Sequence, residues 1–203
     1  MTISEIEGKL AGRIPGILGA RRHYAVLVPL VDRAGELCLL FETRASGMRR
    51  QPGEVCFPGG QAEPGEQPLD CALRETWEEL GIPAAAIHPM APLDVIYHQS
   101  GFVLHPFLAR VEPGPAMDLT LNPDEVGEAF LVPLSFFRDN PPRVGVYELQ
   151  PKAEADFPYE SAGVGADYDW KSGRVEVPIY RYKDRPIWGM TGRIIRHLRE
   201  EIE

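Results

Sequence analysis

One segment, Leu69–Leu80, constrains the fold more than any other part of this sequence. Pro68 suits the first position of a helix and Gly81 suits the position just after its end, so the segment is predicted to be helical. At about 100° per residue, its apolar side chains fall on one side, which we expect to face inward. This inward stripe comprises Leu69, Ala72, Leu73, Thr76 and Leu80.

The opposite side of the predicted helix carries three carboxylates, Glu75, Glu78 and Glu79. Acids three and four residues apart on a helix repel one another, and acids late in a helix oppose its macrodipole. Arg74 can relieve at most one of them, namely Glu78 four residues later. A fold that keeps such acids together favours a divalent cation, and their oxygen ligands favour Mg²⁺ or Mn²⁺ over zinc. The alternative is a solvated helical face that binds nothing.

Strand-like and helix-like segments alternate along the rest of the chain, with no internal repeat. The order predicts an α/β fold. Residues 32–35 (Asp-Arg-Ala-Gly) predict a hairpin turn, and Pro58-Gly59-Gly60 predicts a break. The expected strands are Tyr24–Val31, Leu37–Glu42, Glu54–Phe57, Leu93–Tyr97, Phe102–Val111, Ala129–Val132 and Arg174–Tyr182, and further helices are expected at Thr2–Arg13 and Gly189–Glu200.

The length of 203 residues suits one domain with an appendage. We expect residues 1–20 to form a helix and a linker, and residues 21–203 to form one domain. Within that domain, the composition of residues 151–173 shifts to Gly, Ala, Asp and Glu with scattered aromatic residues. This shift predicts a surface excursion, such as a hairpin insertion, and not a second domain.

Composition excludes several classes of protein. The net charge of −9 argues against nucleic-acid binding, which normally uses a basic stripe. The longest apolar stretch, Tyr24–Val31, is shorter than the roughly 20 residues of a transmembrane helix, and the first residues lack the basic region of a signal peptide. Cys38, Cys56 and Cys71 have no CxxC spacing and are expected to stay reduced. These features predict a cytoplasmic protein that binds neither nucleic acid nor membrane.

Positive charge is concentrated in one window, residues 21–50. It contains six arginines and three acids, so its net charge is +3 within a chain of −9. The planar guanidinium suits bidentate phosphate recognition, which makes the window a candidate surface for an anionic ligand. The alternative is a set of solvated loop arginines.

The predicted helix belongs to a longer motif: Gly60, five residues, Glu66, seven residues, and then residues 74–82 (Arg-Glu-Thr-Trp-Glu-Glu-Leu-Gly-Ile). This motif resembles the Nudix box, G-x5-E-x7-R-E-U-x-E-E-x-G-U, at every fixed polar and glycine position. Thr76 departs from it, because the family usually carries an aliphatic residue there. Since Thr76 lies on the inward stripe, we expect the change to affect packing and to leave the ligands intact.

The resemblance implies the Nudix fold, an α/β/α sandwich around a mixed sheet. It also implies hydrolysis of a nucleoside diphosphate linked to another group, with Mg²⁺ or Mn²⁺ held by the strand–loop–helix of the box. Arg74 would orient a glutamate. The implied ligands are Glu75 and Glu79 as principal ones, Glu78 and Glu66 as assisting ones, and the Gly59 carbonyl as a further one.

The residue that takes the proton from the attacking water differs among Nudix enzymes. It is either a box glutamate, here Glu78 or Glu79, or a glutamate from a later loop, for which Glu125 is the candidate. The alternative for Glu125 is an exposed loop acid after Pro123.

A second motif precedes the box. Residues 39–45 (Leu-Leu-Phe-Glu-Thr-Arg-Ala), then Arg49, Gly53 and residues 57–60 (Phe-Pro-Gly-Gly), are similar to the signature L-L-T-x-R-[SA]-x3-R-x3-G-x3-F-P-G-G of coenzyme A diphosphatases. Glu42 stands in the threonine slot. The resemblance implies that coenzyme A is hydrolysed to 3′,5′-ADP and 4′-phosphopantetheine. The implied substrate-binding residues are Arg44, Arg49, Gly59 and Gly60.

Two alternatives remain open at the level of sequence. One is a Nudix hydrolase that acts on ADP-ribose, a dinucleotide or an acyl-CoA. The other is a non-catalytic Nudix module that senses a nucleotide or binds a protein, although such modules usually lose box acids and none is lost here. The expected partner is a small molecule, and the sequence leaves both a monomer and a homodimer open.

Overall fold

Two strands that follow each other along the chain, β1 (Arg22–Arg33) and β2 (Glu36–Arg44), form the hairpin that the sequence predicts. Ala34 and Gly35 make the turn with φ of 53° and 90°. Such a pair of positive φ values matches the twist of a hairpin. The Asp32 carboxylate accepts a hydrogen bond of 2.7 Å from the Gly35 N–H and closes the turn. This computed structural model describes residues 1–203.

The strands of this hairpin separate beyond the turn, and two short strands fill the space between them. Strand β4 (Gly59–Gln61) pairs with the first part of β1, and β3 (Val55–Cys56) pairs with the last part of β2. The predicted break at Pro58-Gly59-Gly60 is confirmed only at Pro58, where the chain bends between β3 and β4, because the two glycines lie in a strand. Glycine is needed there: a Cβ at Gly59, whose φ is 152°, would collide with the Ala25 carbonyl oxygen.

Four more strands complete a mixed, eight-stranded sheet. Strand β7 (Phe102–Val111), whose bounds match the prediction, is parallel to β1, and β8 (Val126–Pro133) is antiparallel to β2. Strands β5 (Ile87–Pro92) and β6 (Ile96–His98) pair in turn with β7. The predicted strand Leu93–Tyr97 is confirmed only at Ile96 and Tyr97, since Leu93–Val95 link these two strands. Pairing with β7 overrides the local pattern in β5, which includes two prolines, one of them beside a bulge.

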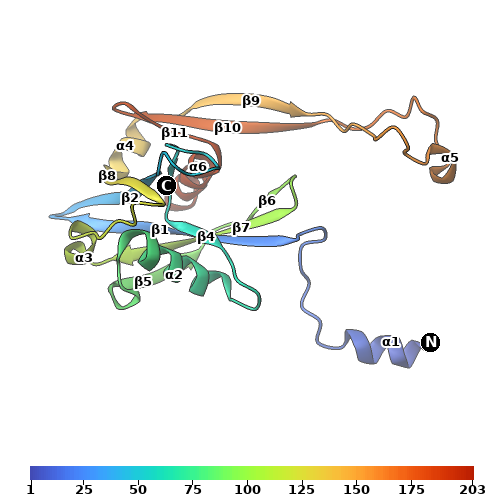
Figure 1. Ribbon diagram of the computed structural model, residues 1–203, viewed down its shortest axis with the longest axis horizontal. Helices are drawn as coiled ribbons and strands as arrows, with labels where there is room; N and C mark the ends of the chain where they lie inside the picture. Colours follow the sequence, from blue (N-terminus) through green and yellow to red (C-terminus); the bar gives the residue numbers. More distant parts are fainter.

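Different elements cover the two faces of this sheet (Figure 1). Helix α2 (Pro68–Leu80) lies on one face, with Pro68 in its first turn and Gly81 ending it at φ 72°. It packs on Ala25 and Leu27 of β1 and on Leu40 of β2. The other face is covered by helix α6 (Gly189–Ile202). It packs on side chains that point away from α2, such as Val28 of β1 and Phe41 of β2. This confirms the predicted α/β/α arrangement around a mixed sheet in one domain.

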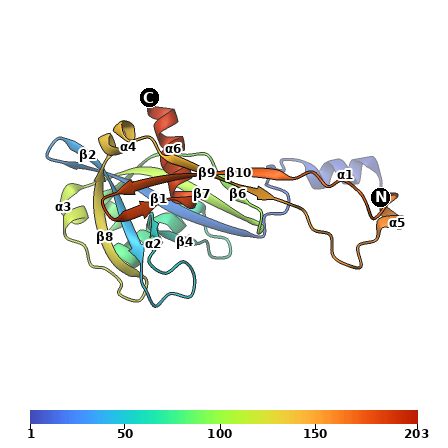
Figure 2. The same ribbon diagram turned by 90° about the horizontal axis from the view of Figure 1, so that it is seen from above.

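A three-stranded sheet lies beside α6, formed by β9 (Arg143–Leu149), β10 (Gly173–Tyr182) and β11 (Arg185–Ile187). Strands β9 and β10 form a hairpin that projects from the body, and the predicted excursion is the long connection at its tip (Figures 1 and 2). No residue between 150 and 172 is buried. The sequence analysis did not predict β9, nor the short helices α3 (Pro113–Met117), α4 (Leu134–Asp139) and α5 (Tyr159–Ala162) and the 3₁₀ turn Ala84–Ala86.

The N-terminal helix α1 (Ile3–Leu10) lies apart from the body and buries none of its residues (Figure 1). Thr2 and Glu5 form a capping box at its start. The helix ends three residues before the predicted Arg13. No helix in the structure combines the length and the apolar character needed to cross a bilayer.

The excursion should contribute little to stability. We predict that replacing Asp156–Ala166 with a short Gly/Ser linker shifts the thermal unfolding midpoint by less than about 4 °C, because the replaced segment contains no buried residue. Circular dichroism melts of the two proteins would test this. A much larger drop would show that the excursion supports the core.

Candidate functional site

Glu79 is the buried centre of the site. The sequence analysis placed it opposite the inward stripe, but only 3% of its surface is exposed. The prediction is wrong because β3 and β4 extend the sheet beneath the second half of α2 and cover this side as well. The Gly59 N–H donates a hydrogen bond of 2.8 Å to Glu79 Oε2. Leu69 and Leu73 of the predicted stripe are only half-buried, whereas Thr76 is fully buried and donates to the Ala72 carbonyl.

Glu75 lies against the backbone of β4, one turn before Glu79. A Cβ at position 60 would collide with the Glu75 carboxylate, so Gly60 makes room for this side chain. The two adjacent glycines therefore serve different purposes. Gly59 allows close approach to β1 and binds Glu79, while Gly60 admits Glu75.

Glu125 joins these two acids from the loop before β8. Carboxylate oxygens of Glu75, Glu79 and Glu125 lie within 4.8 Å of one another. The loop is held in place because the Asn122 N–H donates to the Glu79 carbonyl at 2.9 Å and the Ala45 N–H donates to the Glu125 carbonyl at 2.8 Å. Three acids distant in sequence thus meet in one cluster, which we call the carboxylate triad.

Arg74 holds the remaining box acids. Its guanidinium contacts Glu66 at 2.9 Å, Glu75 at 2.8 Å and Glu78 at 2.9 Å, so the expectation that it relieves one acid at most is wrong. Its planar fork reaches three partners at once. Hydrogen bonds from Arg74 lower the pKa of Glu66 to about 2, and both Glu66 oxygens are engaged. Glu66 and the exposed Glu78 lie outside the triad, and their roles as assisting ligands stay predictions.

Burial makes the triad electrostatically unfavourable without a counter-charge. It raises the pKa of Glu79 to about 9, with a further contribution from the Glu42 carboxylate, and it raises the pKa of Glu75. Glu42 itself is 1% exposed, and burial raises its pKa to about 7. The sequence analysis missed this residue as a member of the site. The available signal was an acid within an apolar strand.

The residues present fit a divalent cation. All the donors are carboxylate oxygens, the class of ligand that Mg²⁺ and Mn²⁺ prefer. Gly59 engages only one oxygen of Glu79, and the buried Oε2 of Glu42 has no hydrogen-bond partner. Glu75, Glu79 and Glu125 are the residues that could hold such an ion. The Gly59 carbonyl stays a predicted further ligand.

The two signature arginines lie at the end of β2 and on the turn that follows it. Arg44, at the end of β2, is half-buried, and its Nε donates to the Arg50 carbonyl at 3.3 Å. Its charge acts on the nearby Glu42 and lowers that carboxyl's pKa against the effect of burial. Arg49 is exposed on the turn between β2 and β3 and forms no ion pair. Their contact with substrate stays a prediction.

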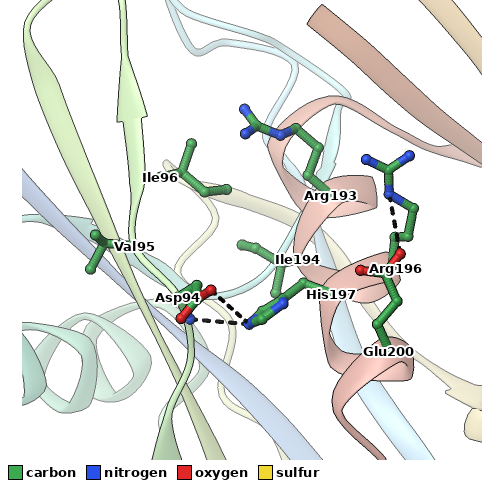
Figure 3. A pocket seen from close by; sticks show the side chains of 8 residues that line it. All are labelled: Asp94, Val95, Ile96, Arg193, Ile194, Arg196, His197 and Glu200. Atoms are coloured by element: carbon green, nitrogen blue, oxygen red, sulfur yellow. Dashed lines mark hydrogen bonds and ion pairs between the residues drawn. The ribbon is translucent and has the colours of Figure 1, made fainter. Parts of the chain in front are cut away.

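Two hollows lie at different places relative to the triad, one on the α6 side of the sheet and one at the start of α2. One, of about 250 Å³, lies between the β5–β6 link and α6, where Asp94 faces His197 beside Arg193 (Figure 3). It is on the face of the sheet opposite to α2, away from the carboxylates. The other, of about 510 Å³, adjoins Gly60 and the start of α2. Its lining includes Arg21, Arg22, His23 and His105, together with residues 61–68.

The raised pKa values predict a specific pH dependence. A carboxyl whose pKa is raised from 4.5 to about 9 keeps its proton in the folded protein when the unfolded chain has lost it. Stability of the metal-free protein should therefore fall as pH rises through this window. We predict that the free energy of urea unfolding in EDTA drops by more than about 1 kcal/mol between pH 5.5 and 8.5.

The variant Glu79→Gln should flatten this dependence and be more stable than the wild type at pH 8.5. Glu78→Gln is the matched control, because Glu78 is exposed on the same helix, and it should retain the wild-type slope. An unchanged slope in Glu79→Gln would contradict the assignment of the buried charge.

Comparisons with known proteins agree with this geometry. Residues 21–149 match the family described as NUDIX domain. An uncharacterized Nudix hydrolase NudL of Yersinia enterocolitica is 32% identical over 194 residues, which cover 93% of this chain and 86% of the relative. Its namesake in Yersinia pestis is 31% identical over 182 residues, covering 89% and 80%.

Among solved structures, a MutT/nudix family protein from Enterococcus faecalis superposes with a TM-score of 0.52 at 15% identity, over 100% of this chain and 70% of that one. This likeness concerns the fold alone. The match over residues 21–149 spans more than half of the chain and includes both the box and Glu125. With the NudL relatives covering most of the remainder, the chain belongs to the Nudix family.

Proposed function

We propose that this Nudix hydrolase cleaves the pyrophosphate of coenzyme A or its derivatives, yielding 3′,5′-ADP and 4′-phosphopantetheine or its acyl form. The observation that carries the catalytic part is the partly buried carboxylate triad, in which Glu75, Glu79 and Glu125 meet within 4.8 Å. The substrate part rests on Arg44 and Arg49 in the second motif. We also propose a cytoplasmic location, where the three free cysteines stay reduced.

The cation proposed for this site is Mg²⁺ or Mn²⁺. When bound, it would neutralise phosphate oxygens and lower the pKa of a coordinated water from 15.7 toward about 7. Glu75, Glu79 and Glu125 would hold it. Arg74 fixes the Glu75 carboxylate at 2.8 Å and the Gly59 N–H fixes that of Glu79 at 2.8 Å, so both are positioned before any ligand arrives.

Hydrolysis requires a water oxygen to attack phosphorus, a phosphorus–oxygen bond of the anhydride to break, and the water's proton to reach a base. Glu125 is our candidate for that base, because its half-buried side chain borders the triad from a separate loop. The alternative base is a box glutamate, Glu78 or Glu79. Glu78 is exposed and ion-paired with Arg74, and Glu79 is buried and accepts a hydrogen bond from the Gly59 N–H. Positioning and charge neutralisation would supply most of the rate.

The choice of coenzyme A depends on its third phosphate. Coenzyme A carries a 3′-phosphate that ADP-ribose and simple dinucleotides lack, which adds roughly 1.5–2 negative charges near neutral pH. Arg44 and Arg49 are engaged by no acid. A charge-assisted hydrogen bond contributes about 1.5–3 kcal/mol, so these arginines would favour the substrate with the extra phosphate.

Removing a ligand charge from the triad should abolish most activity. We predict that Glu79→Gln lowers kcat at least about 100-fold with folding intact, because each 1.36 kcal/mol lost from transition-state stabilisation slows the reaction about tenfold. Single-turnover rates with saturating Mg²⁺ would measure it. Glu36→Gln, on the exposed start of β2, is the control. Near-wild-type turnover in Glu79→Gln would reject the triad as the catalytic centre.

The preference among substrates should depend on the 3′-phosphate. We predict that kcat/KM for coenzyme A exceeds that for dephospho-coenzyme A and for ADP-ribose by at least about tenfold, a difference of about 1.4 kcal/mol. Arg49→Ala should reduce this preference more than it slows hydrolysis of dephospho-coenzyme A. Arg50→Ala is the matched control, since Arg50 is exposed beside it but lies outside the motif.

This comparison must use one Mg²⁺ concentration and one ionic strength, because salt screens exposed charges. Equal or faster hydrolysis of ADP-ribose would favour the alternative substrate class and leave the arginines as solvated surface. Binding of a nucleotide without any turnover would favour a sensing module.

A further inference from the structure

Glu42 is a buried acid that directly follows the apolar run Leu37–Phe41 in β2. Its neighbours alternate between the two cores: Phe41 packs on the α6 side, and Leu40 packs on the α2 side. Glu42 therefore points to the α2 side, as does Ala129, its register partner on β8. That is the face on which Glu79 and Glu75 lie.

The position of Glu42 between two strands brings it close to the triad. On one edge its register partner is Cys56 of β3, three residues before the Gly59 that binds Glu79. On the other edge, β8 begins directly after Glu125, whose carbonyl is bound by the Ala45 N–H. The charges of Glu75 and Glu125 act on Glu42, and that of Glu42 acts on Glu79.

The carboxylate of Glu42 is only partly satisfied within the protein. The Cys56 thiol donates a weak hydrogen bond of 3.5 Å to Oε1, while Oε2 is buried and has no partner. Leaving a buried polar atom unpaired costs about 1–3 kcal/mol, and more for a charged group. A side chain that is 1% exposed cannot recover this from solvent.

No arginine offsets this charge directly. Arg74 is committed to three other acids, and Arg44 directs its Nε to a backbone carbonyl. Four carboxylates therefore share one buried region, and Arg74 contacts only Glu75 among them. A cation bound among them would satisfy the free oxygen and reduce the mutual repulsion.

We propose that Glu42 is a fourth carboxylate of the cation site and that its unpartnered Oε2 is a ligand of a divalent metal ion, directly or through a metal-bound water. This inference rests on the cation-binding part of the proposed function and not on the choice of substrate. It assigns a role to Glu42, which stands in the threonine slot of the family signature.

The test uses Mn²⁺ alone as the probe, without any nucleotide. Mn²⁺ affinity would be measured by electron paramagnetic resonance of the free ion, and thermal unfolding would be followed with and without the metal. Glu42→Gln keeps the shape and removes the charge, and Glu42→Thr introduces the residue of the family signature. Glu36→Gln, exposed on the same strand, is the matched control.

We expect Glu42→Gln and Glu42→Thr to weaken Mn²⁺ binding at least about tenfold, as loss of a residue supporting a metal site typically does. The metal-free Glu42→Gln protein should melt at the same temperature as the wild type or higher, because a buried unpaired charge has been removed. Its Mn²⁺-induced rise in melting temperature should shrink, while Glu36→Gln should match the wild type in all three measurements.

A purely structural role predicts the opposite pattern, namely a lower metal-free melting temperature with unchanged Mn²⁺ affinity, and that result would overturn the proposal. Should Glu42→Gln fail to fold, the Glu42→Thr protein decides the question by the same criteria. Because no substrate is present, failure of this test leaves the choice of coenzyme A unaffected. Failure to hydrolyse coenzyme A, in turn, does not alter the Mn²⁺ result.

Discussion

The close approach of the Gly59-Gly60 backbone to both β1 and α2 determines the rest of the site. A Cβ at Gly59 would meet the Ala25 carbonyl, and one at Gly60 would meet the Glu75 carboxylate. With no side chains in the way, β4 can pair with β1 while its first N–H binds Glu79 at 2.8 Å. The helix is thereby fixed against the sheet at a spacing that leaves room for carboxylates and for little else.

That spacing brings several carboxylates close together, and their mutual repulsion is unfavourable. The protein deals with the outer and the inner carboxylates differently. Arg74 gathers Glu66, Glu75 and Glu78 at the accessible side of α2, where water still screens the charges. On the inner side, Glu42 and Glu79 have no cationic partner, and burial raises the pKa of both. The protein can fold with these acids in place because two hydrophobic cores surround them. The cluster that includes Glu42 and Glu79 is nevertheless more favourable with a bound cation than without one.

The sequence predicted those elements whose own residues specify them. Pro68 and Gly81 define α2, and the mainly apolar segment Phe102–Val111 defines β7. Prediction from the sequence failed where pairing with a strand distant in sequence decides whether a segment forms a strand. Strand β5 exists through its pairing with β7 in spite of two prolines, and the two-glycine strand β4 exists through β1.

The same distinction applies to the site. The box acids could be recognised from their spacing, because helical geometry relates Glu75 to Glu79 one turn later. Their burial could not, since a helical projection treats the sheet as lying on one side, whereas β3 and β4 cover Glu79 from another. Glu42 is buried for a similar non-local reason, because it lies between β3 and β8. Glu125 joins the triad only through the loop that Asn122 fastens to the end of α2.

The distribution of charge connects this geometry to the proposed substrate. A chain of net charge −9 repels anions at long range, yet the end of β2 and the turn after it present Arg44 and Arg49, and the charge of Arg44 acts on Glu42. A local basic surface of this kind can direct an anionic ligand to one place on an acidic protein. In the proposed reaction, the arginines would hold the phosphate that is not cleaved, and the cation would face the pyrophosphate that is. The acidic cation site and the arginines are then both required. Carboxylates without a cation would repel the pyrophosphate, and arginines alone would bind it without activating water.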